Sequence, residues 1–258
     1  MRWTLALLAL LAAGCLTTTP TTVTVTTNGG TTSSGTSTSI GSQPSGIPAP
    51  YDRFTSNVQV NIDGDTVVLI SDSLPDHKSA YWPTSDSRYE AYNNQNFHPN
   101  PSHIATNKVT YRIPLHPAPA TTHQQTPLGP IGIAVNGVPF FNQYAAQRQP
   151  LGQEIVSFDQ GNGHPQQQNQ YHYHVEPTKL TDRLGRDAFL GVLLDGYPVY
   201  GPVKDGQTLV SSDLDTYHGL TAVTPESPNG TYQYRFTADA PYLNGVGFYG
   251  TPGTVTMG

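Results

Sequence analysis

Residues 132–142 read GIAVNGVPFFN, and residues 191–201 read GVLLDGYPVYG. Both stretches open with glycine and a short apolar run. Both continue with Asn-Gly or Asp-Gly and place a proline before further apolar or aromatic residues. Asn-Gly or Asp-Gly between apolar runs is a strong hairpin signal, because these residues tolerate the positive φ of a two-residue turn. Each stretch therefore predicts a β-hairpin.

The same order of features continues beyond each hairpin. Each copy later reaches a Tyr-x-Tyr segment, YHYH at 171–174 and YQYR at 232–235. Matched motifs in matched order predict a duplicated β-hairpin and strand unit, with copies at about 130–178 and 189–243. The alternative is chance similarity between two stretches of Gly- and Pro-rich β sequence. The near-equal spacing of the motifs favours duplication.

The rest of the chain also favours short strands. Residues 58–62 and 66–70 alternate apolar and polar positions around an Asp-Gly-Asp turn, which predicts another hairpin. Residues 108–114 (KVTYRIP) predict a strand that its proline ends. Helical periodicity is poor, and its best candidate is a short turn at 143–147. The sequence, with 23 Pro and 25 Gly, is therefore predicted to be all-β with little helix, as a single compact domain over residues 50–258.

Composition and motifs exclude several functions. The formal net charge is −6, only 12% of residues are charged, and Lys and Arg are scattered. No basic stripe exists to meet phosphates, so a nucleic-acid partner is not expected. The sequence also lacks a Gly-x-Ser-x-Gly elbow, a P-loop and a paired-glycine dinucleotide motif.

The N-terminus indicates export and a lipid anchor. Residues 1–14 have the positive start and short apolar run of a signal peptide, and that run is well below the roughly 20 residues that span a bilayer. Cys15, the single cysteine, follows Leu-Ala-Ala-Gly, which resembles a bacterial lipobox. Residues 15–49 are mostly Thr, Ser, Gly and Pro, which is typical of a disordered tether. The expected location is the bacterial cell envelope, attached to the membrane through lipidated Cys15; the alternative is an ordinary signal peptide and a chance cysteine.

The YHYH segment is the strongest candidate for a functional site. Side chains alternate along a strand, so His172 and His174 project together while Tyr171 and Tyr173 project to the other side. His164 lies in a Gly-His-Pro sequence that a hairpin would bring back beside them. Three imidazoles suit a copper or zinc ion and leave one coordination position open. Because ligands must be neutral, affinity is expected to fall below the ordinary His pKa of about 6.5.

Other readings of these residues stay open. The two histidines could face solvent, or pack as polar residues on an amphipathic strand. Glu154 and Asp159 could orient a liganding imidazole, could act as a base on metal-bound water, or could be plain solvated carboxylates. His218 is a weaker candidate, named because it falls in the second repeat roughly where His164 falls in the first.

Several segments, taken in order, resemble those of the YHYH-domain proteins. The matching segments are 75–77 (PDH), 127–129 (PLG), 135–140 (VNGVPF), 163–165 (GHP), 171–174 (YHYH) and 194–202 (LDGYPVYGP). The resemblance implies a secreted or membrane-attached protein and makes His77 a candidate fourth ligand. Relatives often carry cysteines near the Gly-His-Pro segment, and this sequence has none there.

Three classes of function remain. The first is a metal-binding envelope module that captures or delivers copper or zinc. The second is a metal-dependent hydrolase or oxidase. The third is a metal-free module whose tyrosine-rich surface binds a glycan or a protein. The sequence favours a metal ion as ligand but does not choose between binding and catalysis.

Overall fold

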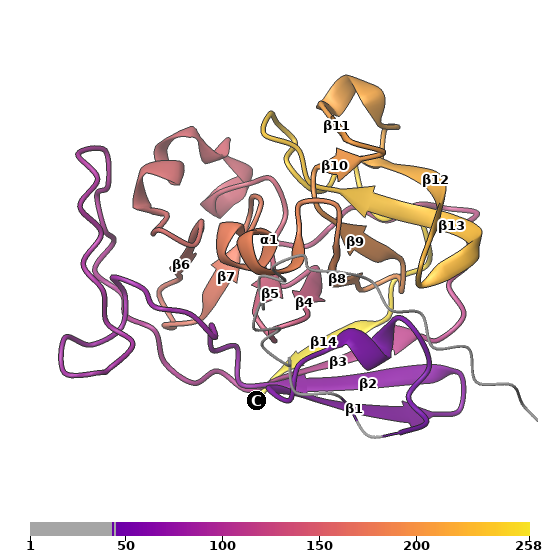
Figure 1. Ribbon diagram of the computed structural model, residues 1–258, viewed down its shortest axis with the longest axis horizontal. Helices are drawn as coiled ribbons and strands as arrows, with labels where there is room; N and C mark the ends of the chain where they lie inside the picture. The colour runs from indigo at the N-terminus through magenta and orange to yellow at the C-terminus, as the bar shows by residue number, and fades with distance from the viewer. Residues whose placement is uncertain (1–42, 44) are drawn as a thin grey trace, which may run out of the picture. The chain divides into compact units, whose positions relative to one another are not determined.

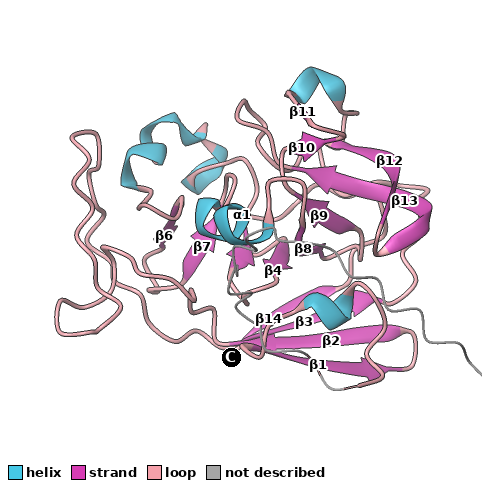
Figure 2. Ribbon diagram, in the orientation of Figure 1, coloured by secondary structure: helices cyan, strands magenta, loops and turns pink. Residues whose placement is uncertain are grey.

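The computed structural model describes residue 43 and residues 45–258 (Figure 1), and strand dominates this part of the chain, as predicted (Figure 2). The strands are β1 (Val58–Asp63), β2 (Thr66–Ser71), β3 (Val109–Pro114), β4 (Gly132–Ala134), β5 (Pro139–Phe140), β6 (Gly163–Pro165), β7 (Tyr171–Tyr173), β8 (Phe189–Leu193), β9 (Pro198–Tyr200), β10 (Val203–Lys204), β11 (Gln207–Thr208), β12 (Gly219–Thr224), β13 (Ser227–Arg235) and β14 (Thr254–Met257). The helical elements are α1 (Thr178–Leu184) and the 3-10 helices η1 (Tyr51–Arg53), η2 (Ala146–Arg148), η3 (Leu151–Gln153), η4 (Ile155–Ser157) and η5 (Ser211–Asp213).

The predicted signal peptide, Cys15 and nearly all of the predicted tether lie outside the described residues. The last part of the tether region belongs to the folded domain. Gln43 Nε2 donates to the carbonyl oxygens of Phe54 and Val58, at 3.2 and 2.9 Å, and Ile47 packs against the core. The domain therefore includes residues before the predicted start at residue 50. None of the helices in the described residues is long or apolar enough to cross a membrane.

A four-stranded antiparallel sheet has the order β1-β2-β3-β14. The predicted hairpin at 58–70 is confirmed as β1 and β2, and Gly64 supplies the positive φ of its turn. The predicted strand at 108–114 is β3. Strand β14, at the C-terminal end of the chain, completes the sheet by pairing with β3.

An eight-stranded sheet holds the repeated motifs and has the order β12-β13-β9-β8-β4-β5-β7-β6. Its two halves are built alike. In one half, β5 is antiparallel to its neighbour β4 and parallel to its other neighbour β7, and β7 also pairs with β6. In the other half, β9 is antiparallel to its neighbour β8 and parallel to its other neighbour β13, and β13 also pairs with β12. The sheet thus has the duplicated arrangement that the repeats predict.

The halves join where β4 pairs with β8 in antiparallel. Ile133 lies opposite Val192, and Gly132 and Gly191 begin the equivalent stretches. A Cβ on Gly191 would collide with the carbonyl oxygen of Ile133, and one on Gly132 would collide with that of Val192. The first glycine of each repeat is therefore required by the close approach of these backbones.

One continuous cluster of buried apolar side chains draws on both sheets. Leu69 and Ile113 come from the four-stranded sheet, and Ile133 and Val192 from the centre of the eight-stranded sheet; all four are fully buried. Each such side chain contributes about 1.5–3 kcal/mol through removal from water. This shared core makes both sheets parts of one domain.

The helices depart from the prediction in one place. The turn expected at 143–147 overlaps the 3-10 helix η2, but α1 was not predicted. Leu180 is buried and Leu184 half-buried one turn later, and Gly185 follows at φ 105°. The local signal for this short helix is a pair of leucines four residues apart, followed directly by a glycine.

Candidate metal centre

Strands β6 and β7 form the hairpin that builds the site. They pair in antiparallel with His164 directly opposite His172, so the hairpin returns His164 beside the YHYH segment as predicted. Tyr171 and Tyr173 project to the other face, where both are fully buried. His174 follows the last residue of β7 and projects to the same side as His172.

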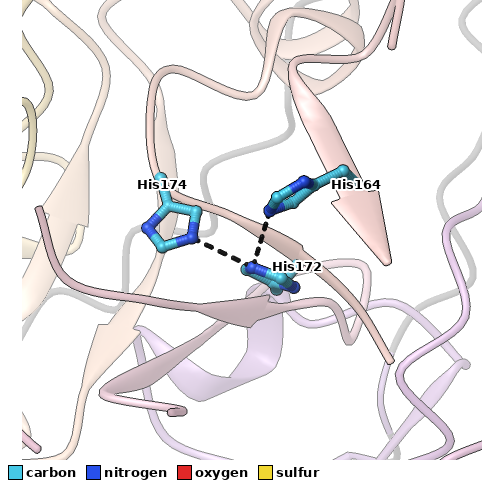
Figure 3. Close-up of side chains that lie close together, drawn as sticks. All are labelled: His164, His172 and His174. Carbon is cyan, nitrogen blue, oxygen red and sulfur yellow. Dashed lines mark hydrogen bonds between the residues drawn. The ribbon is translucent and has the colours of Figure 1, made fainter. Parts of the chain in front are cut away.

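The three imidazoles converge on one point (Figure 3). His172 Nε2 lies 3.1 Å from His164 Nε2 and 3.0 Å from His174 Nε2. One ligand atom from each ring lies within 4.8 Å of those of the other two, and no ring is more than 3% exposed. Ligands at about 2.1 Å from a tetrahedral ion are about 3.4 Å apart, so the rings need only small movements to hold one.

Backbone oxygens fix the proton position on two of these rings. His172 Nδ1 lies 3.1 Å from the Gln170 carbonyl oxygen, and His174 Nδ1 lies 2.5 Å from that of Asn142. A carbonyl oxygen only accepts, so each Nδ1 carries the proton and donates it. The Nε2 atom of both neutral rings is therefore an unprotonated lone pair.

The third ring has hydrogen-bond partners at both of its nitrogens. His164 Nδ1 lies 2.7 Å from the Ser157 hydroxyl and 3.4 Å from the Asn100 amide nitrogen, and its Nε2 lies 3.1 Å from His172 Nε2. In one tautomer the hydroxyl donates to Nδ1, and Nε2–H donates to His172. In the other tautomer Nδ1–H donates to the hydroxyl, which donates its own proton to the Glu154 carbonyl oxygen. The second tautomer directs all three Nε2 lone pairs at one another, as a shared metal ion requires.

Burial keeps these rings neutral. Loss of water lowers the pKa of His164, His172 and His174, with that of His174 reaching about 4, and the neighbouring imidazoles lower the pKa of His164 and His172 further. Burial therefore moves the predicted loss of neutral ligand from pH 6.5 to lower pH for these rings. The ring nitrogens remain unprotonated, as metal ligands must be, well into the acidic range.

Aromatic side chains enclose the cluster. Phe141 stacks on His172 at a centroid distance of 3.9 Å, and Phe158 contacts His164 and His174 at 4.8 and 5.8 Å. Apolar side chains around a site exclude water from it, so the attraction between a metal ion and its ligands is screened less there than at the surface.

Asp159 supports the hairpin from behind and does not orient a ligand. Its Oδ1 accepts from the backbone N–H groups of Gly161 and Gly163 at 2.8 and 3.3 Å and from Tyr171 Oη at 2.8 Å. Its other oxygen accepts from Ser79. The carboxylate therefore fixes the loop that carries His164.

His77, expected as a fourth ligand, lies apart from the other three. Its ring packs against Tyr171 and Tyr173 on the opposite face of β7, at centroid distances of 5.7 and 6.5 Å. Its Nε2 lies 3.1 Å from Tyr173 Oη, and its Nδ1 2.9 Å from the Lys78 carbonyl oxygen. His77 therefore contacts β7, the strand that carries His172, but on the face of the tyrosines and not on that of the histidines.

His218 also lies outside the cluster. The backbone N–H of His218 donates to Asp215, and that of Asn162 donates to Asp159; both residues have positive φ. His218 thus corresponds to Asn162 and not to His164.

The second repeat keeps the scaffold without the imidazoles. Gly163 pairs with Tyr173, and Gly219 pairs with Tyr234, so Gln233 and Arg235 stand where His172 and His174 stand in the first repeat. Arg235 Nη1 even donates to the carbonyl oxygen of Gly201, the counterpart of the Asn142 carbonyl that His174 contacts. Within residues 43 and 45–258, the three-histidine group is the one cluster suited to a metal ion.

Glu154, which the sequence offered as an orienting group or as a base on metal-bound water, lies at the edge of the cluster. Its Oε1 is 3.8 Å from His164 Nε2, and its side chain is 31% exposed. It borders a pocket of about 660 Å³, whose other lining residues are Ala145, Ala146, Gln149, Pro150, Gly152 and Gln153.

The fold and site define a class of protein with a duplicated β-sheet and a buried three-histidine cluster on one repeat. The chain belongs to the YHYH protein family, whose model matches residues 110–210 and 203–247. That match spans more than half of the chain and includes the histidine hairpin. No curated protein and no solved structure matches this chain.

Proposed function

We propose that this protein captures a copper or zinc ion through His164, His172 and His174 while anchored in the cell envelope. The ion is the cargo, and the β6–β7 hairpin is the binding element. The observation that carries the proposal is the convergence of three buried imidazoles, one ligand atom from each, inside an apolar enclosure.

A cation makes that convergence favourable. The Nδ1 protons of His172 and His174 are donated outward to carbonyl oxygens, so their desolvated Nε2 lone pairs lie 3.0 Å apart and repel each other. A positive ion at their common point removes the repulsion and replaces it with three bonds. Oxygen atoms that receive Nδ1–H from a ligand also raise its basicity and fix its orientation, as is usual around metal sites.

A metal-free glycan-binding surface is less well supported. The tyrosines of both Tyr-x-Tyr segments, which made such a surface attractive, are buried. Buried rings stabilise the core and present no face to a sugar. Metal binding is the function for which described residues already supply the chemistry.

The envelope location rests on the sequence. A lipobox-like Cys15 after a signal-like segment would attach the chain by lipid, and the Thr- and Ser-rich segment after it would hold the domain away from the bilayer. A captured ion would then stay at the membrane surface.

Metal titration of the purified, metal-free chain tests the proposal. Zinc or copper should bind at one ion per chain and raise the melting temperature, since an ion at a hundred times its Kd adds about 2.7 kcal/mol to stability. The double variant His172→Ala/His174→Ala should lose this stoichiometric binding. The control His103→Ala/His116→Ala removes two exposed imidazoles and should bind normally. Equal metal content in both double variants, or no binding by the unmodified chain, contradicts the proposal.

A further inference from the structure

Glu154 is tied to His164 through its backbone as well as its side chain. It lies between η3 and η4, and its carbonyl oxygen lies 2.7 Å from the Ser157 hydroxyl, which in turn lies 2.7 Å from His164 Nδ1. Its carboxylate reaches around to the opposite nitrogen of the same ring, with Oε1 3.8 Å from Nε2. One short segment therefore positions His164 and a carboxylate together.

The Glu154 carboxylate lies near ligand-to-ligand distance from one of the three imidazoles, that of His164. Ligand atoms around a tetrahedral zinc or copper ion at about 2.1 Å are about 3.4 Å apart, so Oε1 is only a few tenths of an ångström beyond that separation from Nε2. The other carboxylate oxygen, Oε2, is buried and has no hydrogen-bond partner among the described residues. A desolvated carboxylate oxygen without a donor, in a side chain whose other oxygen lies 3.8 Å from His164 Nε2, is a ligand group that lacks its cation.

We propose that Glu154 is the fourth ligand, which completes a His₃Glu site, and that its side chain forms the entrance. This inference rests on the proposed function. The three histidines are at most 3% exposed, whereas the Glu154 side chain is 31% exposed and borders the pocket of about 660 Å³. An ion therefore reaches the imidazoles from the pocket, past the carboxylate.

The carboxylate also sets which ion the site prefers. Three neutral imidazoles bring no charge, so Glu154 supplies the one negative charge among the four ligands. A carboxylate oxygen is a hard ligand that favours divalent ions, whereas monovalent copper prefers soft thiolate or thioether sulfur. The site is thus selective for Zn²⁺ or Cu²⁺ over Cu⁺, because of one residue outside the YHYH segment.

Glu154→Gln tests both parts, because glutamine keeps the shape and removes the charge. Affinities of the full chain for Zn²⁺, Cu²⁺ and Cu⁺ are measured by competition with a chromophoric chelator, Cu⁺ under reducing and anaerobic conditions. We expect the variant to bind the two divalent ions at least tenfold more weakly and Cu⁺ less than threefold more weakly. The control Asp63→Asn removes an exposed carboxylate from β1 and should change none of the three affinities.

The results separate this inference from the proposed function. If the unmodified chain binds the divalent ions and Glu154→Gln binds them equally well, Glu154 is not a ligand, although the three-histidine site stands. If the variant loses affinity equally for all three ions, the carboxylate does not set selectivity, and that part is overturned. If the unmodified chain binds no ion at all, the proposed function itself is wrong.

Discussion

Acidification should destabilise the metal-free protein, because its clustered histidines cannot accept protons while they are buried. Burial lowers the pKa of His174 to about 4 in the folded chain, whereas the unfolded chain has an ordinary value of about 6.5. Between these values the unfolded state binds a proton that the folded state does not. Stability is therefore fully present above pH 6.5 and is lost as the pH falls toward 4.

The size of the effect follows from the shift. Each buried imidazole contributes a slope of about 1.4 kcal/mol per pH unit across its window. His174 alone then accounts for about 3 kcal/mol between pH 6.5 and 4. The pKa values of His164 and His172 are lowered in the same direction, so they steepen the slope. This is a large part of the 5–15 kcal/mol or so that stabilises a typical domain.

Urea unfolding at a series of pH values, with a chelator present, measures this slope. The variant His172→Gln places at this position the residue that the second repeat uses at Gln233, and its slope should be smaller by about 1.4 kcal/mol per pH unit. Buried Asp195, whose pKa desolvation raises to about 6, acts in the opposite direction between pH 6 and 4, and it cancels in the comparison. Equal slopes for the two proteins would refute the reasoning.

Three further outcomes are expected. Cys15→Ser should move the protein from the membrane to the soluble fraction on cell fractionation, and unchanged membrane association would contradict the lipobox interpretation. Asp159→Asn should cost about 1.5–3 kcal/mol in urea unfolding because it weakens buried charged hydrogen bonds. Asp215→Asn should cost less, because Asp215 accepts from the equivalent Gly219 and Tyr232 of the second repeat at an exposed position. Gly191→Ala should destabilise the fold by about 3 kcal/mol or more in the same assay, because its methyl group would meet the Ile133 carbonyl; a near-neutral result would contradict the close approach of β4 and β8.

The parts of the fold that depend on neighbouring residues could be predicted from the sequence. Turn dipeptides identified three hairpins, because positive φ is a property of the residues in the turn. The shared face of His172 and His174 followed from strand alternation, which needs no knowledge of the rest of the chain. The position of His164 followed because its loop is short and ends at the paired strand.

Features that depend on distant contacts could not be predicted. Strand β14 pairs with β3 across more than half of the chain, and no local pattern specifies that partner. His77 reaches the tyrosine face of β7 through a long loop, so a segment match could not say which face it occupies. The nearness of Glu154 to His164, and the burial that lowers the histidine pKa values, likewise arise from packing.

The central strand pair has the geometry of a two-fold axis. Ile133 faces Val192, its own counterpart, and the flanking pairs exchange equivalent positions on either side. Such a contact is self-complementary, so a single repeat unit carries both surfaces needed to form a homodimer with an identical copy. In the fused chain the two copies need not stay identical, and one could replace its histidines with Gln233 and Arg235 while the interface stayed whole. Covalent linkage of the two repeats thus allows the histidine cluster to be present in one repeat and absent from the other.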